Sequence, residues 1–331
     1  FTSYIDGVGF DPGLINFAFK TLPTIIFFSS LVSVLYHFGV IQKIVKFIAR
    51  SMQKTMGTSG SETLSVSGNI FLGQTESPLM VRPFISKMTK SELMAIMTGG
   101  FATVSGGVLA IYVSWLSNIP GIAGHLLAAS VMSAPAALVI AKIIYPETKK
   151  SKTMGDLNIE IKQSHTNGME ALSTGATDGL KLAANIAAML IAFISFVAMI
   201  NFFLAYLGTS MEAIFGFIFR PLAWTMGVPW SDAELVGMLM GKKIVLTELI
   251  AYGDLQKMII NEEITSDSRT AIISTYALCG FSNFGSIGIQ LGGIGAMAPD
   301  RKKDLAKLVT KAMFGGALAS WLTATIAGLL I

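Results

Sequence analysis

Four long apolar runs constrain this chain more than any other feature of its sequence. Each run holds about 20 residues or more with almost no charge, the length that a helix needs to cross a hydrocarbon core of about 30 Å. Only 13% of the 331 residues are charged, roughly half of what is usual in soluble domains. The sequence therefore predicts an all-α integral membrane protein. The runs are Leu22–Val40, Ile122–Ile144, Leu182–Leu207 and Ala312–Ile331.

Two further stretches, Ala95–Leu116 and Thr270–Met297, are long enough to span a membrane but are rich in glycine and serine. These residues interrupt helices and free main-chain groups. At membrane depth such groups are tolerated only where they line a cavity or are buried in protein. We therefore expect two discontinuous transmembrane helices that border a polar site.

Basic residues lie in four clusters. All four fall on one side of the membrane if the stretch between Lys54 and Arg82 enters the bilayer and returns. Lys and Arg accumulate in cytoplasmic loops, so this side is expected to be the cytoplasm. No basic and aromatic stripe indicates nucleic-acid binding, and the single cysteine excludes a disulfide framework. The clusters are Lys43–Lys54, Arg82–Lys90, Lys149–Lys152 and Arg301–Lys307.

The two halves of the chain share a pattern. Thr55-Met56-Gly57 recurs as Thr225-Met226-Gly227, and each is followed by a pair of glutamates 14 residues apart: Glu62 with Glu76, and Glu234 with Glu248. Further on, Gly100-Phe101 and Gly280-Phe281 open the two interrupted stretches. Duplicated halves of this kind lie inverted in many secondary transporters. We therefore expect inverted repeats.

The hydrophobic stretches around the later glutamates, Leu64–Phe84 and Leu235–Tyr252, are interrupted by Gly, Pro or charge. This favours two re-entrant helical hairpins over straight spans. The expected plan has four segments. Residues 1–57 form a scaffold transmembrane helix and an interfacial helix, and residues 58–148 form the first transport repeat. Residues 149–227 hold a linker, an interfacial helix near 169–181 and a scaffold transmembrane helix, and residues 228–331 form the second transport repeat.

Two of these glutamates are the leading candidates for a site. A carboxylate inside a membrane is costly and normally lines a polar cavity. Glu76 follows Gln74 and Thr75, and Glu248 occupies the matching position of the second half. We expect Glu76 and Glu248 to face one another across a buried substrate site. The alternative for Glu248 is a structural ion pair with Lys242 or Lys243.

Side chains of the interrupted stretches add candidates. Asn283 and Ser286 are three residues apart, so a helical turn would place them on one face. Phe281 and Val108 offer apolar surface for a ring. Such a site suits a neutral, hydroxyl-rich solute with a flat heterocycle. Separately, Asn69 and Thr103 supply oxygen ligands for a monovalent cation such as sodium, although such residues also cap turns.

Three motifs carry a resemblance to a known family. Gly68–Pro78 (GNIFLGQTESP), the Gly-x-Lys-x-x-x-x-Glu pattern of Gly241–Glu248, and Ala277–Gly295 (ALCGFSNFGSIGIQLGGIG) resemble the concentrative nucleoside transporters. The similarity runs from about Leu22 to the end of the chain. Family members carry further N-terminal helices, and this chain opens at Phe1 without an initiator methionine, which suggests that its numbering starts inside a longer product.

The resemblance implies a multi-pass protein of the bacterial inner membrane. It would import nucleosides such as uridine or adenosine by symport with sodium, as a homotrimer in the lipid bilayer. In each protomer, the hairpins and broken helices would move together as an elevator-like transport domain. No cofactor is implied other than sodium as the coupling ion.

The resemblance also implies a role for each site residue. Gln74, Thr75 and Glu76 would recognise the base, with Val108 and Phe281 beside it. Glu248, Asn283 and Ser286 would bind the ribose hydroxyls. Sodium would be held by the side chains of Asn69 and Thr103 and the carbonyls of Leu72 and Val104. One departure bears on selectivity: the family usually has Asn and Phe on either side of the second glutamate, where this chain has Thr247 and Leu249.

Three other functions are weighed against sodium symport. A proton-coupled nucleoside symporter is the nearest alternative, because carboxylates can carry protons. An intramembrane enzyme using Glu76 and Glu248 as acid and base is disfavoured, since no HExxH motif occurs and the histidines are far from either glutamate in sequence. A passive channel would not need two half-spanning hairpins.

Overall fold

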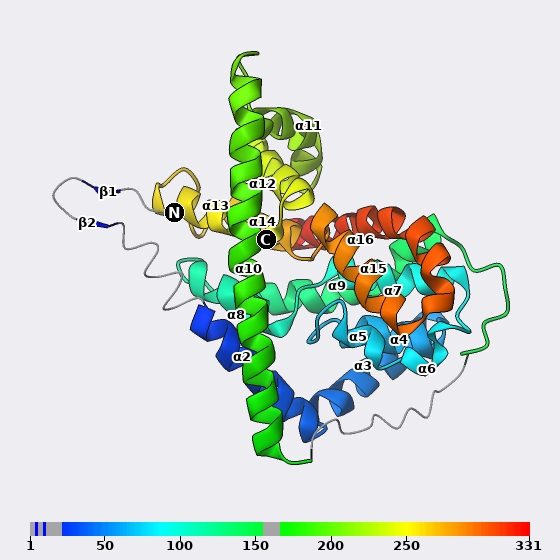
Figure 1. Ribbon diagram of the computed structural model, residues 1–331. Coiled ribbons are helices and arrows are strands. Elements are labelled where there is room, and N and C mark those ends of the chain that lie inside the picture. The colour runs from blue at the N-terminus through cyan, green and yellow to red at the C-terminus, as the bar shows by residue number, and fades with distance from the viewer. Residues whose placement is uncertain (1–3, 6–8, 11–21, 155–165) are drawn as a thin grey trace.

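A computed structural model describes residues 4–5, 9–10, 22–154 and 166–331 (Figure 1). The described chain is helical apart from a short antiparallel pair, β1 (Tyr4–Ile5) and β2 (Gly9–Phe10). The all-α fold predicted from the apolar runs is confirmed. Three segments are long and apolar enough to cross a membrane, or four if the bent α2–α3 pair is one span, within the part of the chain that was described. The three are Lys90–Trp115, Ile122–Ile144 and Pro299–Leu330.

The first helices change direction sharply. α2 (Leu22–His37) and α3 (Val40–Met56) meet at an angle of 74°. Gly39 lies between them with φ 73°, a left-handed conformation that glycine adopts without steric cost. α3 buries Ile41, Val45 and Met52 on one face. It is therefore amphipathic, and its interfacial position stays a prediction.

Two helical hairpins follow the glutamate patterns. In the first, α4 (Gly60–Gly68) leads through a turn to α5 (Glu76–Leu79) and α6 (Arg82–Ile85). A capping box of Ser59 and Glu62 begins α4, and the Ser77 hydroxyl donates to the carbonyl of Ser65 across the hairpin. In the second, α12 (Ala233–Val245) turns into α13 (Glu248–Ile260), which begins at the N-cap Thr247.

Both interrupted stretches are broken helices, as predicted. α7 (Lys90–Ala102) and α8 (Gly106–Trp115) are separated by residues 103–105, and α14 (Arg269–Leu278) and α15 (Phe284–Met297) by residues 279–283. The proposed match of Gly100-Phe101 with Gly280-Phe281 does not hold locally. Phe101 lies inside α7, whereas Phe281 lies in the second break, because α14 ends earlier relative to its motif.

The two breaks contact each other directly. The Phe281 amide donates to the Thr103 carbonyl over 3.3 Å, and the Ser282 hydroxyl donates to the Phe101 carbonyl over 2.8 Å. Gly280 has φ 110°, and a Cβ there would lie 2.7 Å from the Phe101 oxygen. Glycine is therefore required both by the backbone conformation and by this close approach.

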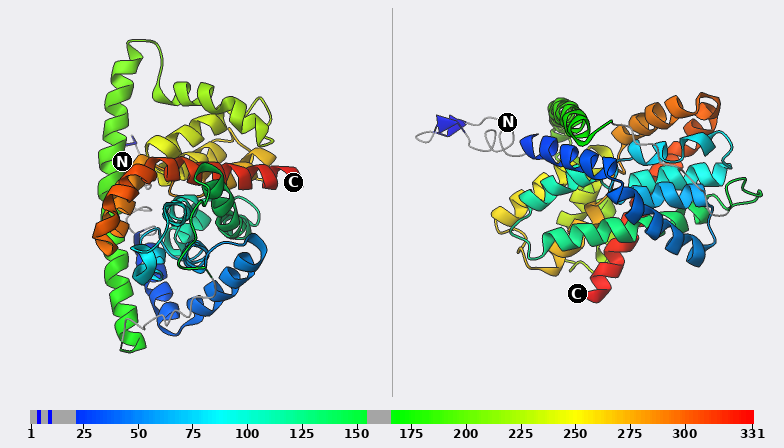
Figure 2. Two further views of the ribbon diagram at one scale, coloured as in Figure 1. Left: turned by 90° about the vertical axis from the view of Figure 1, so that its right-hand side faces the viewer. Right: turned by 90° about the horizontal axis from the view of Figure 1, so that it is seen from below.

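The longest helix borders the molecule on one side. α10 (Gly168–Ala205) has 38 residues, which at 1.5 Å per residue is about 57 Å. It is unbroken through residues 169–181, where the sequence predicts an interfacial helix, and only Ser195–Ala205 within it counts as a shorter apolar helix among the described residues. The other helices lie to one side of α10 (Figure 2). Gly175 and Gly179 bring its backbone against α2, as small residues do in packed membrane helices.

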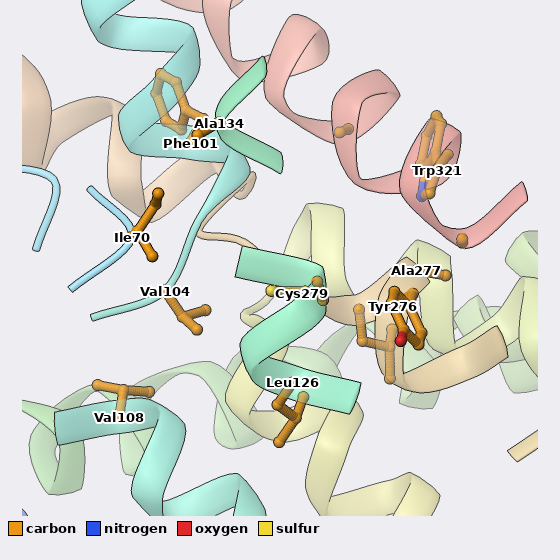
Figure 3. Packing of buried hydrophobic residues seen from close by; sticks show 14 of the residues in the cluster. Ile70, Phe101, Val104, Val108, Leu126, Ala134, Tyr276, Ala277, Cys279 and Trp321 are labelled. Carbon is orange, nitrogen blue, oxygen red and sulfur yellow. The ribbon is translucent and has the colours of Figure 1, made fainter. Parts of the chain in front are cut away.

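The core lies around the breaks. α9 (Ile122–Ile144) and α16 (Lys302–Leu330), which follows the short η2 (Pro299–Arg301), pack on α7. α11 (Met211–Thr225) packs on α12. One buried cluster includes Ile70 of the first hairpin, Val104 and Cys279 of the breaks, and Leu126 of α9 (Figure 3). The breaks are thus held in a densely packed environment.

Candidate substrate and cation site

The tip of the first hairpin packs against the broken helices. The Gly106 amide, at the start of α8, donates to the Phe71 carbonyl over 3.1 Å. A Cβ on Gly100 of α7 would lie 3.1 Å from the Cβ of Gln74 and 2.8 Å from the amide nitrogen of Gln290. This close packing brings the Gln74 amide between α7 and α15.

Gln74 is held by two side chains of α15. Its amide nitrogen donates to the Ser286 hydroxyl over 3.2 Å, and its carbonyl accepts from Gln290 Nε2 over 3.2 Å. Gln290 Nε2 also donates to the Met97 carbonyl over 3.1 Å. All three side chains are buried. The first hairpin is therefore joined to the second broken helix through Gln74, Ser286 and Gln290.

Glu248 is buried at the second hairpin, with an exposed fraction of 4%. Its carboxylate accepts from the Tyr112 hydroxyl and from Asn283 Nδ2, each over 3.0 Å. Asn283 is also the N-cap of α15, and its Oδ1 accepts from the Ser286 amide over 2.8 Å. Asn283 thus joins the Glu248 carboxylate to the Gln74 group in one continuous polar network.

Neither Lys242 nor Lys243 forms a salt bridge within 4 Å of the Glu248 carboxylate. Lys242 instead pairs with Asp254 at 2.7 Å and Glu212 at 3.3 Å, and Lys243 donates to main-chain carbonyls. Thr247, the departure from the family pattern, accepts from the Ile250 amide over 3.3 Å as the N-cap of α13. Thr and Asn both serve as N-caps, so this substitution preserves the start of the helix that carries Glu248.

The two glutamates do not have equal environments. Glu76 is exposed, because it begins the short α5 at the tip of the hairpin. Its carboxylate folds back over Gly73, in the space that a Cβ there would need. Burial is therefore observed for Glu248, whereas Glu76 has exposed surface at the hairpin tip, and its place opposite Glu248 stays a prediction. Thr75 is half-buried and packs on Gly293 of α15.

Two apolar side chains lie near the polar network. Val108 is buried on α8, one helical turn before Tyr112. Phe281 is half-buried in the second break, with its main chain bonded to Thr103. Each belongs to an element that carries a member of the network: Val108 shares α8 with Tyr112, and Phe281 lies beside Asn283 at the second break.

The predicted cation ligands gather at the first break. Asn69 is fully buried as the C-cap of α4, and neither its Oδ1 nor its Nδ2 has a hydrogen-bond partner among the described residues. Its Nδ2 lies 3.3 Å from the position that a Cβ on Gly99 would take. Thr103 is also buried, and its hydroxyl donates to the Gly99 carbonyl over 2.9 Å. Both side chains therefore lie at the end of α7.

Leu72 and Val104, the other two predicted ligands, are buried. Within residues 22–154 and 166–331, no hydrogen bond is accepted by either main-chain carbonyl. Buried polar groups without partners are uncommon and call for an explanation. An amide, a hydroxyl and free carbonyls are oxygen donors of the kind that hold coupling ions at unwound helices. The residues present fit a monovalent cation.

Sequence reasoning missed Tyr112 and Gln290. Both lie four residues after a predicted site residue on the same helix, Tyr112 after Val108 and Gln290 after Ser286. Residues four apart share a helical face, so this spacing was the available signal. It could not identify their partners, because Tyr112 and Glu248 are 136 residues apart.

Comparison with known proteins supplies the family. The model described as "Na+ dependent nucleoside transporter C-terminus" matches residues 125–328, and the model described as "Nucleoside recognition" matches residues 18–118. The chain belongs to the Na+-dependent nucleoside transporter family. Because this is a family of transporters, the prediction that the chain is not an enzyme is confirmed, as is the resemblance seen in the three motifs.

Individual relatives extend over nearly the whole chain. Human sodium/nucleoside cotransporter 1 is 45% identical over 333 residues, covering 95% of this chain and 51% of the relative. An uncharacterized transporter of Haemophilus influenzae is 44% identical, covering 95% of this chain and 76% of the relative. The chain spans about half the length of the mammalian cotransporters that it matches.

Solved structures of CNTnw have the same fold. CNTnw in an inward-facing, substrate-bound state matches with a TM-score of 0.87 and 44% identity, covering 95% of this chain and 74% of that chain. A CNTnw variant in an outward-facing state matches with a TM-score of 0.86 and 43% identity. Together with the apolar helices, these matches establish a multi-pass membrane protein with the transporter fold.

Proposed function

We propose that this protein imports nucleosides across the cell's inner membrane by symport with sodium. The observation that carries this proposal is the polar network from Gln74 through Ser286 and Asn283 to Glu248. It joins the two hairpins through a broken helix and contains no fixed cation among its members. Such a network suits a neutral polar solute better than an anion.

The network offers different chemistry at its two ends. The Gln74 amide presents both a donor and an acceptor, which matches the mixed edges of nucleobases. Gln290 fixes its orientation, while Val108 and Phe281 provide apolar surface for the ring. At the other end, the carboxylate of Glu248 would accept hydrogen bonds from ribose hydroxyls. Thr75 and Glu76, at the tip, would contact the base when the hairpin closes over it.

Sodium is proposed to bind at the first break, with Asn69, Thr103, Leu72 and Val104 as ligands. The fully buried, unpartnered Asn69 amide supports this assignment. Coupling would pass through the contact between breaks, because the Thr103 carbonyl accepts from the Phe281 amide. An ion that orders the first break would thereby hold its main chain against the already ordered second break, in the arrangement that binds substrate. By linkage, the nucleoside must raise sodium affinity by the same factor.

The larger-scale mechanism is also proposed. The hairpins and broken helices would move together as an elevator-like unit, while α2 and α10 stay in the scaffold. Support comes from the packing: the two breaks are bonded to each other and to the first hairpin. The scaffold would assemble as a homotrimer through the side of α10 that faces away from the rest of the protomer, where Phe196, Met199 and Phe203 are exposed.

Uptake of radiolabelled uridine and adenosine into proteoliposomes tests the proposal. An inward sodium gradient is expected to drive saturable accumulation above equilibrium, and removing sodium should abolish it. Accumulation driven by a pH gradient without sodium would replace the proposal with proton symport. Flux that only equilibrates the nucleoside and does not saturate would indicate a channel instead.

A further inference from the structure

A fully buried lysine lies at the second break. Lys243 belongs to the last turn of α12 and has no exposed surface. Its ammonium donates to the carbonyls of Ala277 over 3.0 Å and Cys279 over 2.8 Å. These carbonyls belong to the end of α14, where the helix is interrupted. The function proposed above uses neither this side chain nor these contacts.

The acceptors explain how a charge can be buried at this position. The last carbonyls of a helix have no partners within it, and they carry the negative end of the helix dipole. Cys279, the C-cap of α14, also accepts from the Ser320 hydroxyl. The Glu248 carboxylate interacts electrostatically with the same ammonium. Lys243 thus connects the broken end of α14 with the carboxylate of the proposed sugar site.

The first break has the same plan with a different side chain. There, Asn69 at the end of α4 approaches the last turn of α7. Both α4 and α12 are the first helices of their hairpins, and each sends one side chain to the break that follows. In the first half this is a neutral amide without a partner. In the second half it is a cation with two carbonyls.

We propose that the Lys243 ammonium is a tethered cation that does at the second break what the coupling sodium does at the first. It compensates the freed carbonyls of α14 and positions Asn283 and Glu248 for the sugar. This inference rests on the proposed sodium site at the first break. Its consequence is an asymmetry: the first break responds to sodium, whereas the second is ordered whether sodium is present or not.

Hydrogen–deuterium exchange on the unmodified protein tests this asymmetry. Amides around 103–106 are expected to gain protection when sodium replaces choline in the buffer. Amides around 279–283 are expected to be protected already in choline and to change less than twofold. Sodium-dependent protection of the second break as large as that of the first would overturn the inference. If neither break responds but the second is protected, the sodium proposal fails and the role of Lys243 stands.

Replacement of Lys243 tests its positioning role. Lys243→Ala is expected to weaken uridine binding at saturating sodium at least tenfold, measured by calorimetry. Methylammonium or ethylammonium should restore affinity to within threefold of the original value, and tetramethylammonium, which has no N–H donor, should not. Lys243→Met fills the space of the side chain without its charge, so this variant should still bind uridine weakly. Lys242→Ala is the matched control, because Lys242 pairs with Glu212 and Asp254.

Two results would contradict this role. One is a Lys243→Met protein that binds uridine within twofold of the original, since the charge would then be dispensable. The other is a Lys243→Ala protein whose uridine affinity stays low with every alkylammonium ion, while Lys243→Met has a uridine affinity near the original. The Lys243 side chain would then only fill space. If neither variant folds, the exchange measurement on the unmodified protein decides.

Discussion

Replacing Glu248 with Gln probes the best-defined polar contact of the site. The carboxylate accepts from Tyr112 and Asn283, each over 3.0 Å. A carboxylate has about four lone-pair positions, so these two contacts leave acceptor capacity for ribose hydroxyls. Gln keeps one acceptor oxygen and replaces the other with a donor. If the remaining oxygen of the Gln side chain accepts from Asn283, the side chain offers the sugar no charged acceptor.

The size of the effect follows from the lost charge. A hydrogen bond to a charged group contributes about 1.5–3 kcal/mol, and about 1.4 kcal/mol corresponds to a tenfold change in Kd. Loss of one such bond to a ribose hydroxyl should therefore weaken uridine binding roughly 10- to 150-fold. Because Glu248 is buried, solvent screening does not reduce this estimate greatly.

Calorimetric binding of uridine and 2′,3′-dideoxyuridine to the original and variant proteins separates the sugar contact from general damage. The original protein should prefer uridine strongly, and Glu248→Gln should bind the two ligands with nearly equal affinity. Glu234→Gln is the matched control, because Glu234 is exposed and pairs with Arg220. If Glu248→Gln weakens both ligands by the same factor, Glu248 does not read the ribose and the assignment is refuted.

Three further predictions concern the cation site, the break and a buried ion pair. Asn69→Ala should raise the sodium concentration for half-maximal thermal stabilisation about tenfold, the effect of losing one ligand worth about 1.4 kcal/mol; an unchanged midpoint would remove Asn69 from the site. Gly280→Ala should lower the free energy of unfolding by about 1–3 kcal/mol, because its φ is positive and a Cβ would meet Phe101. Gly288→Ala is the control, because open space surrounds Gly288, and it should leave thermal stability unchanged. Equal losses of stability in the two variants would contradict the strain argument. Lys142→Met should lower the free energy of unfolding by on the order of 3 kcal/mol, because the buried Glu62 carboxylate loses the ammonium that lies 2.6 Å away. Adding Glu62→Gln to this variant should restore most of the lost stability. If it does not, the loss does not come from breaking the ion pair.

Local sequence signals predicted most of the architecture. The apolar run Ile122–Ile144, whose only charge is Lys142 in its last turn, has the same bounds as α9, because an apolar segment of that length has few alternatives to a spanning helix. Glycines and serines indicated both broken helices, and the interruptions around Glu76 and Glu248 indicated both hairpins. These features depend on residues close together in the chain. The same local reasoning placed Asn283 and Ser286 together, and in the structure Asn283 caps the helix turn that holds Ser286.

The sequence by itself determined that this protein is a helical membrane protein with two hairpins, two broken helices and a set of polar residues where polarity is costly. Only the tertiary structure decided which of those residues meet. Gln74 and Ser286 are 212 residues apart, and no local pattern specifies that pairing. Packing also separated the two glutamates, leaving Glu76 exposed at a hairpin tip and burying Glu248 between Tyr112 and Asn283. Burial and partner choice depend on how whole helices pack, so residue type and spacing alone could not distinguish them.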